Sequence, residues 1–117
     1  RVRENMNYSI SVIERNLRNA NSITDCTNPM SISYLDQYGK VSSFSCIISE
    51  NDSYIASGSA RLTSNNVQIT ACGFVCTQPT DLSNPPIVTI DISAKDKASV
   101  SDTGTSVSLQ SKVYLRN

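Results

Sequence analysis

The first 20 residues of the chain carry apolar side chains at the spacing of an α-helix. Successive apolar positions lie three or four residues apart, which places them on one stripe of a helix with a 3.6-residue period. The opposite face carries mainly charged and amide side chains, so we expect an amphipathic helix that ends within the polar segment 19–22. The stripe consists of Val2, Met6, Ile10, Ile13, Leu17 and Ala20.

The predicted helix has no capping residue at its start. Ser, Thr, Asp and Asn are the usual N-caps because their side chains accept a hydrogen bond from a free backbone N–H group. None of these residues precedes Val2. We therefore expect the helix to continue upstream of Arg1.

From residue 30 onward, apolar and polar positions alternate, which is the pattern of half-buried β-strands. Polar segments separate the alternating runs, and we expect 58–66, 77–86 and 94–104 to be connecting loops. In the last run, Ser111 is a polar step on an otherwise apolar face. The residues expected to face inward are, strand by strand, Ile32 and Tyr34; Phe44, Cys46 and Ile48; Val67, Ile69, Ala71 and Val75; Val88, Ile90 and Ile92; and Val107, Leu109, Val113 and Leu115.

These patterns predict an α+β fold in which the N-terminal helix packs on one antiparallel β-sheet. A helix with one apolar stripe and a sheet with one apolar face each need a partner, and packing them together buries both. A chain of 117 residues has the length of one domain. We expect residues 1–117 to form it, with the helix in 1–22 and the β-rich region in 30–117.

Four cysteines, Cys26, Cys46, Cys72 and Cys76, indicate two disulfides, with free buried thiols and a metal site as alternatives. A four-cysteine zinc site usually has two closely spaced pairs, and here only Cys72 and Cys76 are close. An even cysteine count in a short chain rich in Ser and Thr favours an oxidising compartment. We predict the pairs Cys26–Cys46 and Cys72–Cys76. The second pair requires a tight turn at 73–75, and an extended segment there would instead indicate a crossed pairing.

The charge and composition of the chain exclude several classes of function. Lys and Arg number 10, as do Asp and Glu, so the chain has no basic surplus for nucleic acid, and we expect no nucleic-acid partner. The chain contains no His, which excludes catalysis by a His base and His-ligated metal sites. The carboxylates are scattered along the chain, and no Gly-rich phosphate loop is present. We therefore expect no catalytic residues and no enzymatic activity.

The one metal that the sequence leaves open is calcium. Asp96 and Asp102 lie in the polar segment before the last strand, and Ca²⁺ prefers carboxylate and carbonyl oxygens. The spacing fits no EF-hand loop. An ordinary solvated loop is the alternative, and we expect no other cofactor.

Three short segments share a combination of apolar residues and Asn: 17–23 (LRNANSI) at the end of the helix, 61–67 (RLTSNNV) before a strand, and the closing 113–117 (VYLRN). Together they resemble type IV pilin-like proteins of the minor pilin or pseudopilin kind. Such proteins carry an apolar half-helix upstream that anchors the precursor in the inner membrane and later packs in a filament core. The prepilin-peptidase motif of the family is absent from this sequence, so none of its residues is assigned here.

The resemblance implies a structural subunit of a bacterial type IV pilus or type II secretion-like filament, acting in filament assembly or at the tip. It implies other pilin or pseudopilin subunits as partners, and a place in the cell envelope and then in an extracellular filament. Loops 77–86 and 94–104 would make variable contacts, and some relatives bind calcium in a late loop. The residues implied to hold the helix on the sheet and to serve assembly are Val2, Met6, Ile10, Ile13 and Leu17.

A second hypothesis is a secreted, disulfide-stapled adhesin or binding module. Its loops would recognise a surface or a sugar, and a cleavable signal peptide would replace the apolar half-helix. The two hypotheses differ in what they predict immediately upstream of Arg1.

Overall fold

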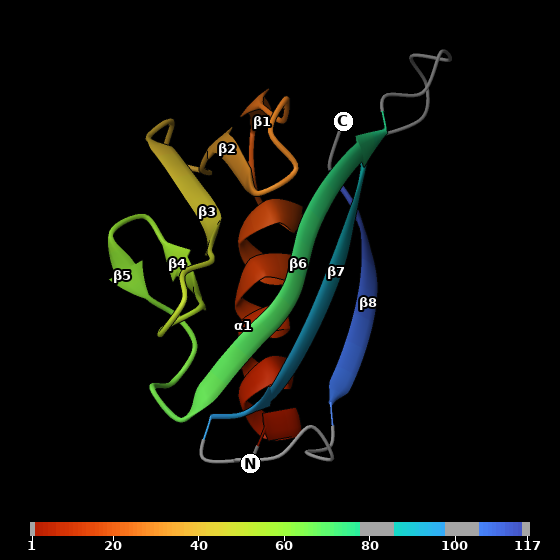
Figure 1. The fold of residues 1–117 in the computed structure, drawn as a ribbon. Helices are drawn as coiled ribbons and strands as arrows, with labels where there is room; N and C mark the ends of the chain where they lie inside the picture. The colour runs from red at the N-terminus through yellow and green to blue at the C-terminus, as the bar shows by residue number, and fades with distance from the viewer. Residues whose placement is uncertain (1, 78–85, 98–105, 116–117) are drawn as a thin grey trace.

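The computed structural model describes residues 2–77, 86–97 and 106–115. Within them the chain opens with one helix and continues as eight strands (Figure 1). The helix confirms the prediction from the apolar stripe, although it ends at Arg18. The elements are α1 (Val2–Arg18), β1 (Ser22–Asp25), β2 (Ser31–Leu35), β3 (Val41–Ile47), β4 (Tyr54–Ser57), β5 (Ala60–Arg61), β6 (Val67–Thr77), β7 (Ile87–Asp96) and β8 (Val107–Tyr114).

The strands form two antiparallel sheets, so the predicted α+β fold with one helix on a single sheet is wrong. A five-stranded sheet has the order β1-β2-β3-β4-β5, and a three-stranded sheet has the order β6-β7-β8. The described part of the chain is therefore mostly β. Alternation along a strand reports which side chains are buried but not which strand lies alongside, so the sequence pattern could not divide the strands between sheets.

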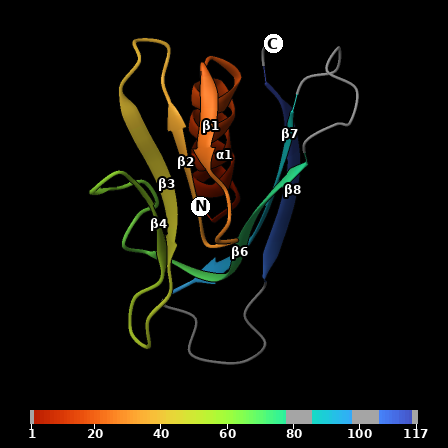
Figure 2. The same cartoon turned by 90° about the horizontal axis from the view of Figure 1, so that it is seen from above.

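Helix α1 lies between the two sheets, with β2, β3 and β4 on one side and β7 and β8 on the other (Figure 2). It packs chiefly on β8 and β7. The buried apolar residues of α1 and of both sheets form one cluster. Within α1 the buried apolar side chains are Met6, Ile10, Ile13 and Leu17, whereas Val2 is only half-buried.

Strand β6 contains an irregularity that reverses its inward and outward faces. Val67 and Ile69 are buried, but the register with β7 shifts between Ile69 and Ala71. One extra residue in a strand moves every later side chain to the opposite face. Beyond the shift Phe74 is therefore buried, and Val75, which we expected to face the core, is 55% exposed.

Other predicted boundaries also change. Strand β7 runs on to Asp96 and buries Ala94, so the predicted loop over 94–104 begins as a strand. The polar segment 58–66 contains the short strand β5. Ile48 lies just after β3 and is 50% exposed, which makes its predicted place in the core wrong. The alternation predicted for β2 is confirmed.

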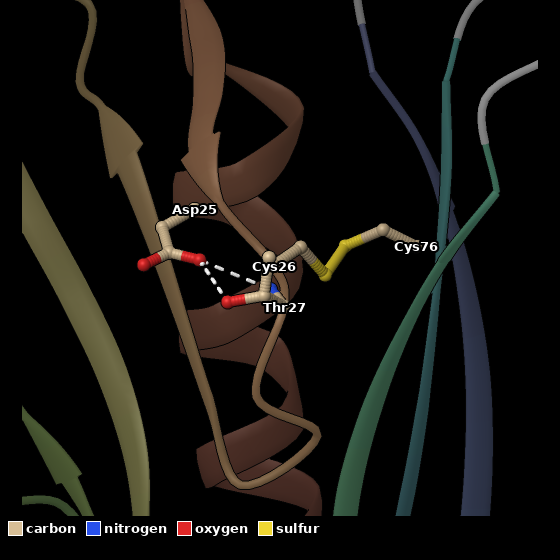
Figure 3. Close-up of a disulfide and its surroundings, with 4 residues drawn as sticks. All are labelled: Asp25, Cys26, Thr27 and Cys76. Atoms are coloured by element: carbon tan, nitrogen blue, oxygen red, sulfur yellow. Dashed lines mark hydrogen bonds between the residues drawn. A yellow bond between two sulfur atoms is a disulfide. The ribbon is translucent and has the colours of Figure 1, made fainter.

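All four cysteines form disulfides, but not in the predicted pairs. Cys26 pairs with Cys76 (Figure 3), and Cys46 pairs with Cys72. The predicted Cys72–Cys76 bond is wrong because 72–76 is extended within β6, where residues four apart lie roughly 13 Å from each other. The observed arrangement is nested: the Cys46–Cys72 bond, with a separation of 26 residues, lies inside the loop closed by Cys26–Cys76, with a separation of 50. It is therefore not the crossed alternative either.

Both disulfides join the β1–β5 half of the chain to β6. Cys46 lies in β3, and Cys26 directly follows β1. Backbone hydrogen bonds reinforce this junction: Phe74 N–H donates to the Pro29 carbonyl at 2.8 Å, and Ile69 N–H donates to the Ser53 carbonyl at 3.0 Å. The disulfides thus hold the two sheets together along the strand whose register shifts.

Candidate functional site

The five residues implied to serve assembly lie on the inward side of α1. Met6, Ile13 and Leu17 are fully buried within the molecule. The role in assembly of the five residues stays a prediction. The exposed side chains on the opposite side of the helix, here called the outer face of α1, are Arg3, Glu4, Asn7, Tyr8, Ser11, Arg15 and Arg18.

Polar contacts fix how α1 sits between the sheets. The Ser111 hydroxyl of β8 donates a hydrogen bond to the Glu14 carboxylate, so the polar step in the last strand has a partner on the helix. Near the start of α1, Asn5 Oδ1 accepts a hydrogen bond from the Ser64 N–H at 3.0 Å. Buried Ser9 donates to the Asn5 carbonyl one turn earlier. These bonds tie the helix to β8 at one point and to the segment before β6 at another.

A charged cluster, absent from our predictions, joins the β4–β5 hairpin to the end of β7. Asp52 receives two hydrogen bonds from the Arg61 guanidinium, at 2.7 and 3.0 Å, and lies 3.3 Å from Lys97 Nζ. Arg61 also lies over the Tyr54 ring, 4.3 Å from its centroid, and its Nε donates to the Thr63 carbonyl. A forked, two-point arginine–carboxylate contact fixes geometry as well as charge.

The charged cluster shifts the acidity of its members. The hydrogen bonds from Arg61 are the main reason that the pKa of Asp52 falls to about 2, with Lys97 acting in the same direction. No sequence spacing pointed to the cluster, since its members come from separate elements.

Asp25, which lies beside the Cys26–Cys76 disulfide and outside the charged cluster, also has a lowered pKa, because its carboxylate accepts hydrogen bonds from the Thr27 N–H and hydroxyl (Figure 3).

Two adjoining hollows lie between the last turns of α1 and the five-stranded sheet. The smaller, of about 160 Å³, is lined by α1 and by the turn between β2 and β3. The larger, of about 400 Å³, lies against β2, β3 and β4. Asn16 lines both hollows, so we describe them together as the α1 groove.

The structure describes only one of the two predicted calcium residues. Asp96 ends β7 in register with Val67, and Asp102 lies outside the described residues. In the part of the chain that the structure describes, no three His, Cys, Asp or Glu side chains gather as metal ligands. The calcium site therefore stays a prediction. Of loop 77–86, only Thr77 and Pro86 are among the described residues.

Comparison with known proteins identifies no relative. No family model matches the chain, and neither curated proteins nor solved structures give a match. The likeness of 17–23, 61–67 and 113–117 to pilin-like proteins therefore stays a prediction from short segments. Among the described residues, no helix has the length and apolar character needed to cross a membrane.

Proposed function

We propose that this chain is a structural subunit of a bacterial type IV pilus or type II secretion-like filament, of the minor pilin or pseudopilin kind. The observation that carries the proposal is the position of α1. It opens the chain, its N-terminal end lies at one end of the molecule (Figure 1), and its outer face is exposed along its length. A helix placed in this way has an exposed face that can pack on other subunits.

The two disulfides and the sequence segments add support. A disulfide frame between the sheets suits a protein that works outside the reducing cytosol. The pilin-like segments 17–23, 61–67 and 113–117 lie at the end of α1, before β6 and at the end of the chain. The proposal rests on the helix and on these segments, and not on the single-sheet architecture, which is wrong.

The proposed assembly has two parts. An apolar helical segment upstream of Arg1 anchors the precursor in the inner membrane, and in the filament it packs among equivalent segments. The outer face of α1 then meets neighbouring subunits. Near the start of this face the charges of Arg3 and Glu4 cancel, whereas Arg15 and Arg18 make its end basic, so the end of the helix is where an acidic surface of a neighbour would be attracted.

The first experiment reads the encoded sequence upstream of Arg1 and locates the protein in fractionated cells. The proposal expects about 20 apolar residues directly upstream and recovery of the protein in membranes and sheared filaments. A short cleavable signal peptide, with the protein recovered as a secreted monomer, overturns the proposal and favours the secreted binding module.

The second experiment places a photo-crosslinking residue, benzoylphenylalanine, at Tyr8 in cells that assemble the filament. Tyr8 is 62% exposed on the outer face of α1, so the proposal expects crosslinks to neighbouring subunits. Tyr114 is the matched control, since it is 58% exposed on the side of β8 that points away from α1. Crosslinks at Tyr114 with none at Tyr8 contradict packing through the helix.

A further inference from the structure

The α1 groove combines polar side chains from three places in the chain. Asn16 comes from the helix, Ser42 and Ser57 come from β3 and β4, and Gln37 and Tyr38 come from the turn between β2 and β3. The larger hollow, of about 400 Å³, has the size of a small-molecule site in proteins. The helix and the sheet therefore enclose a concavity that neither element forms alone.

The floor of the groove is the inward face of β2, β3 and β4, where serine side chains lie beside the aromatic rings of the core. In the register of β2, β3 and β4, Tyr34 pairs with Ser42 and Phe44 pairs with Ser57, so the two serines share the inward face of the sheet with the aromatic rings. The Tyr34 and Phe44 rings stack with centroids 5.6 Å apart, which makes this floor rigid. Within the described chain the half-buried Ser57 hydroxyl has no hydrogen-bond partner and is free to bind a ligand.

The rim of the groove presents an aromatic ring on an ordered turn. Asp36 Oδ1 accepts hydrogen bonds from the N–H groups of Tyr38 and Lys40, both at 2.9 Å, and Gly39 takes a φ of 81° to close the turn. Tyr38 is held there with 80% of its surface exposed. Asp36 and Tyr38 both line the smaller hollow, and the second carboxylate oxygen of Asp36 receives no hydrogen bond from the described residues.

The chemistry of the groove selects its ligand class. Its charged lining residues are Arg15 and Asp36, whose charges cancel, so it offers no net attraction to an anion or a cation. Amides and hydroxyls both donate and accept hydrogen bonds, which suits a ligand made of hydroxyl groups. An exposed tyrosine ring is an apolar surface for the C–H face of a sugar ring.

We propose that the α1 groove binds an uncharged saccharide, with Tyr38 stacking on a sugar ring and Asn16, Ser57 and Asp36 bonding its hydroxyls. The inference does not depend on the proposed filament role, because the groove lies within one copy of the chain. Binding is expected whether the protein is a filament subunit or a secreted module.

The test is an NMR titration of the disulfide-bonded protein with three neutral trisaccharides, namely maltotriose, chitotriose and mannotriose, and with anionic sialyllactose. The proposal expects at least one neutral sugar to shift the amide signals of Asn16, Tyr38 and Ser57 at millimolar concentration, with sialyllactose weaker. No shift of these signals by any neutral sugar at about 10 mM overturns the proposal, since binding weaker than that is negligible. Shifts confined to residues outside the groove overturn it equally.

Matched variants separate stacking from general effects on the fold. Tyr38→Ala is expected to weaken binding at least tenfold, whereas Tyr38→Phe keeps the ring and most of the affinity. Tyr8→Ala is the control, because Tyr8 is an exposed tyrosine that does not line the groove. Equal losses in Tyr8→Ala and Tyr38→Ala, with circular dichroism unchanged, contradict the assigned site.

Discussion

Ser111 of β8 donates a hydrogen bond to the carboxylate of Glu14 on α1, across 97 residues of sequence. The bond explains why a serine interrupts the apolar face of the last strand: that face packs on α1, and a helix carboxylate reaches it there. It adds a polar contact to the apolar packing that holds α1 against the three-stranded sheet.

The Glu14–Ser111 bond predicts a measurable stability effect. Ser111→Ala leaves the half-buried carboxylate without its donor and is expected to lower the free energy of unfolding by about 1–2 kcal/mol. Urea denaturation of Ser111→Ala, Glu14→Gln and the double variant gives the coupling energy. A coupling near zero, with each single variant as stable as the parent, contradicts a stabilising role.

The nested disulfides predict a specific peptide map. Under non-reducing conditions, cleavage after Lys40, Arg61 and Phe74 separates all four cysteines, so every bond appears as a linked peptide pair. The structure expects Cys26 linked to Cys76 and Cys46 linked to Cys72. A peptide pair joining Cys72 to Cys76 shows that the sequential pairing forms instead.

Removing either disulfide is expected to cost substantial stability. In the chain-entropy account, loops of this length contribute roughly 3–4 kcal/mol each, and the inner bond shortens the loop that the outer one closes. We therefore expect each of two double variants, Cys46→Ala/Cys72→Ala and Cys26→Ala/Cys76→Ala, to unfold at a clearly lower urea concentration than the parent protein. If both unfold at the midpoint of the parent protein, the bonds do not constrain the unfolded chain.

The charged cluster predicts acid sensitivity of a definite sign. The folded-state pKa of Asp52 is about 2, against an ordinary value of 3.8. The contribution of Asp52 to the stability of the folded state is therefore present above about pH 4 and is lost as the pH falls through 2. Asp25 acts in the same direction. Thermal denaturation between pH 5 and pH 2 is expected to show a weaker pH dependence for Asp52→Asn than for the parent.

The control for this prediction is Asp91→Asn. Asp91 accepts a hydrogen bond from the neutral side chain of Gln110 and lies outside the charged cluster. Its replacement removes one carboxylate and leaves the contacts of Arg61 and Lys97 intact, so a change of slope found in Asp52→Asn alone is assigned to the charged cluster. If Asp52→Asn keeps the parent slope, then Arg61 and Lys97 do not hold the Asp52 carboxylate ionised.

The register shift in β6 predicts opposite outcomes at neighbouring residues. Phe74 is fully buried, so Phe74→Ala is expected to lower the free energy of unfolding by about 3–5 kcal/mol through lost burial and a cavity. Val75 is exposed, and Val75→Ser is expected to change the free energy of unfolding by about 0.5 kcal/mol or less. If the alternation continued unbroken from Ile69, Val75 would be buried and Phe74 exposed, and Val75→Ser would be the more destabilising variant. Chemical denaturation of the two variants distinguishes these two arrangements.

Local patterns in the sequence predicted much of the secondary structure. The apolar stripe predicted α1, and alternation predicted the inward faces of β2, such as Ile32 and Tyr34. In β6 the same reasoning failed after Ile69, because the apolar residues Ala71 and Val75 continue the earlier alternation, and only the pairing with β7 reveals the inserted residue. The α1 groove could not be predicted either, since Asn16, Tyr38 and Ser57 come from three separate elements.

The sequence by itself determined the N-terminal helix and most of the strands, and it favoured disulfides for the four cysteines, because backbone periodicity and cysteine chemistry are local properties. Only the tertiary structure decided that the strands divide into two sheets, that Cys46 bonds Cys72, and that Asp52, Arg61 and Lys97 meet. These contacts join residues that are distant in the chain, and many pairings of the same strands satisfy the same pattern. Packing both sheets around α1 selects one of them, because it buries the apolar faces together and gives the polar step at Ser111 its partner.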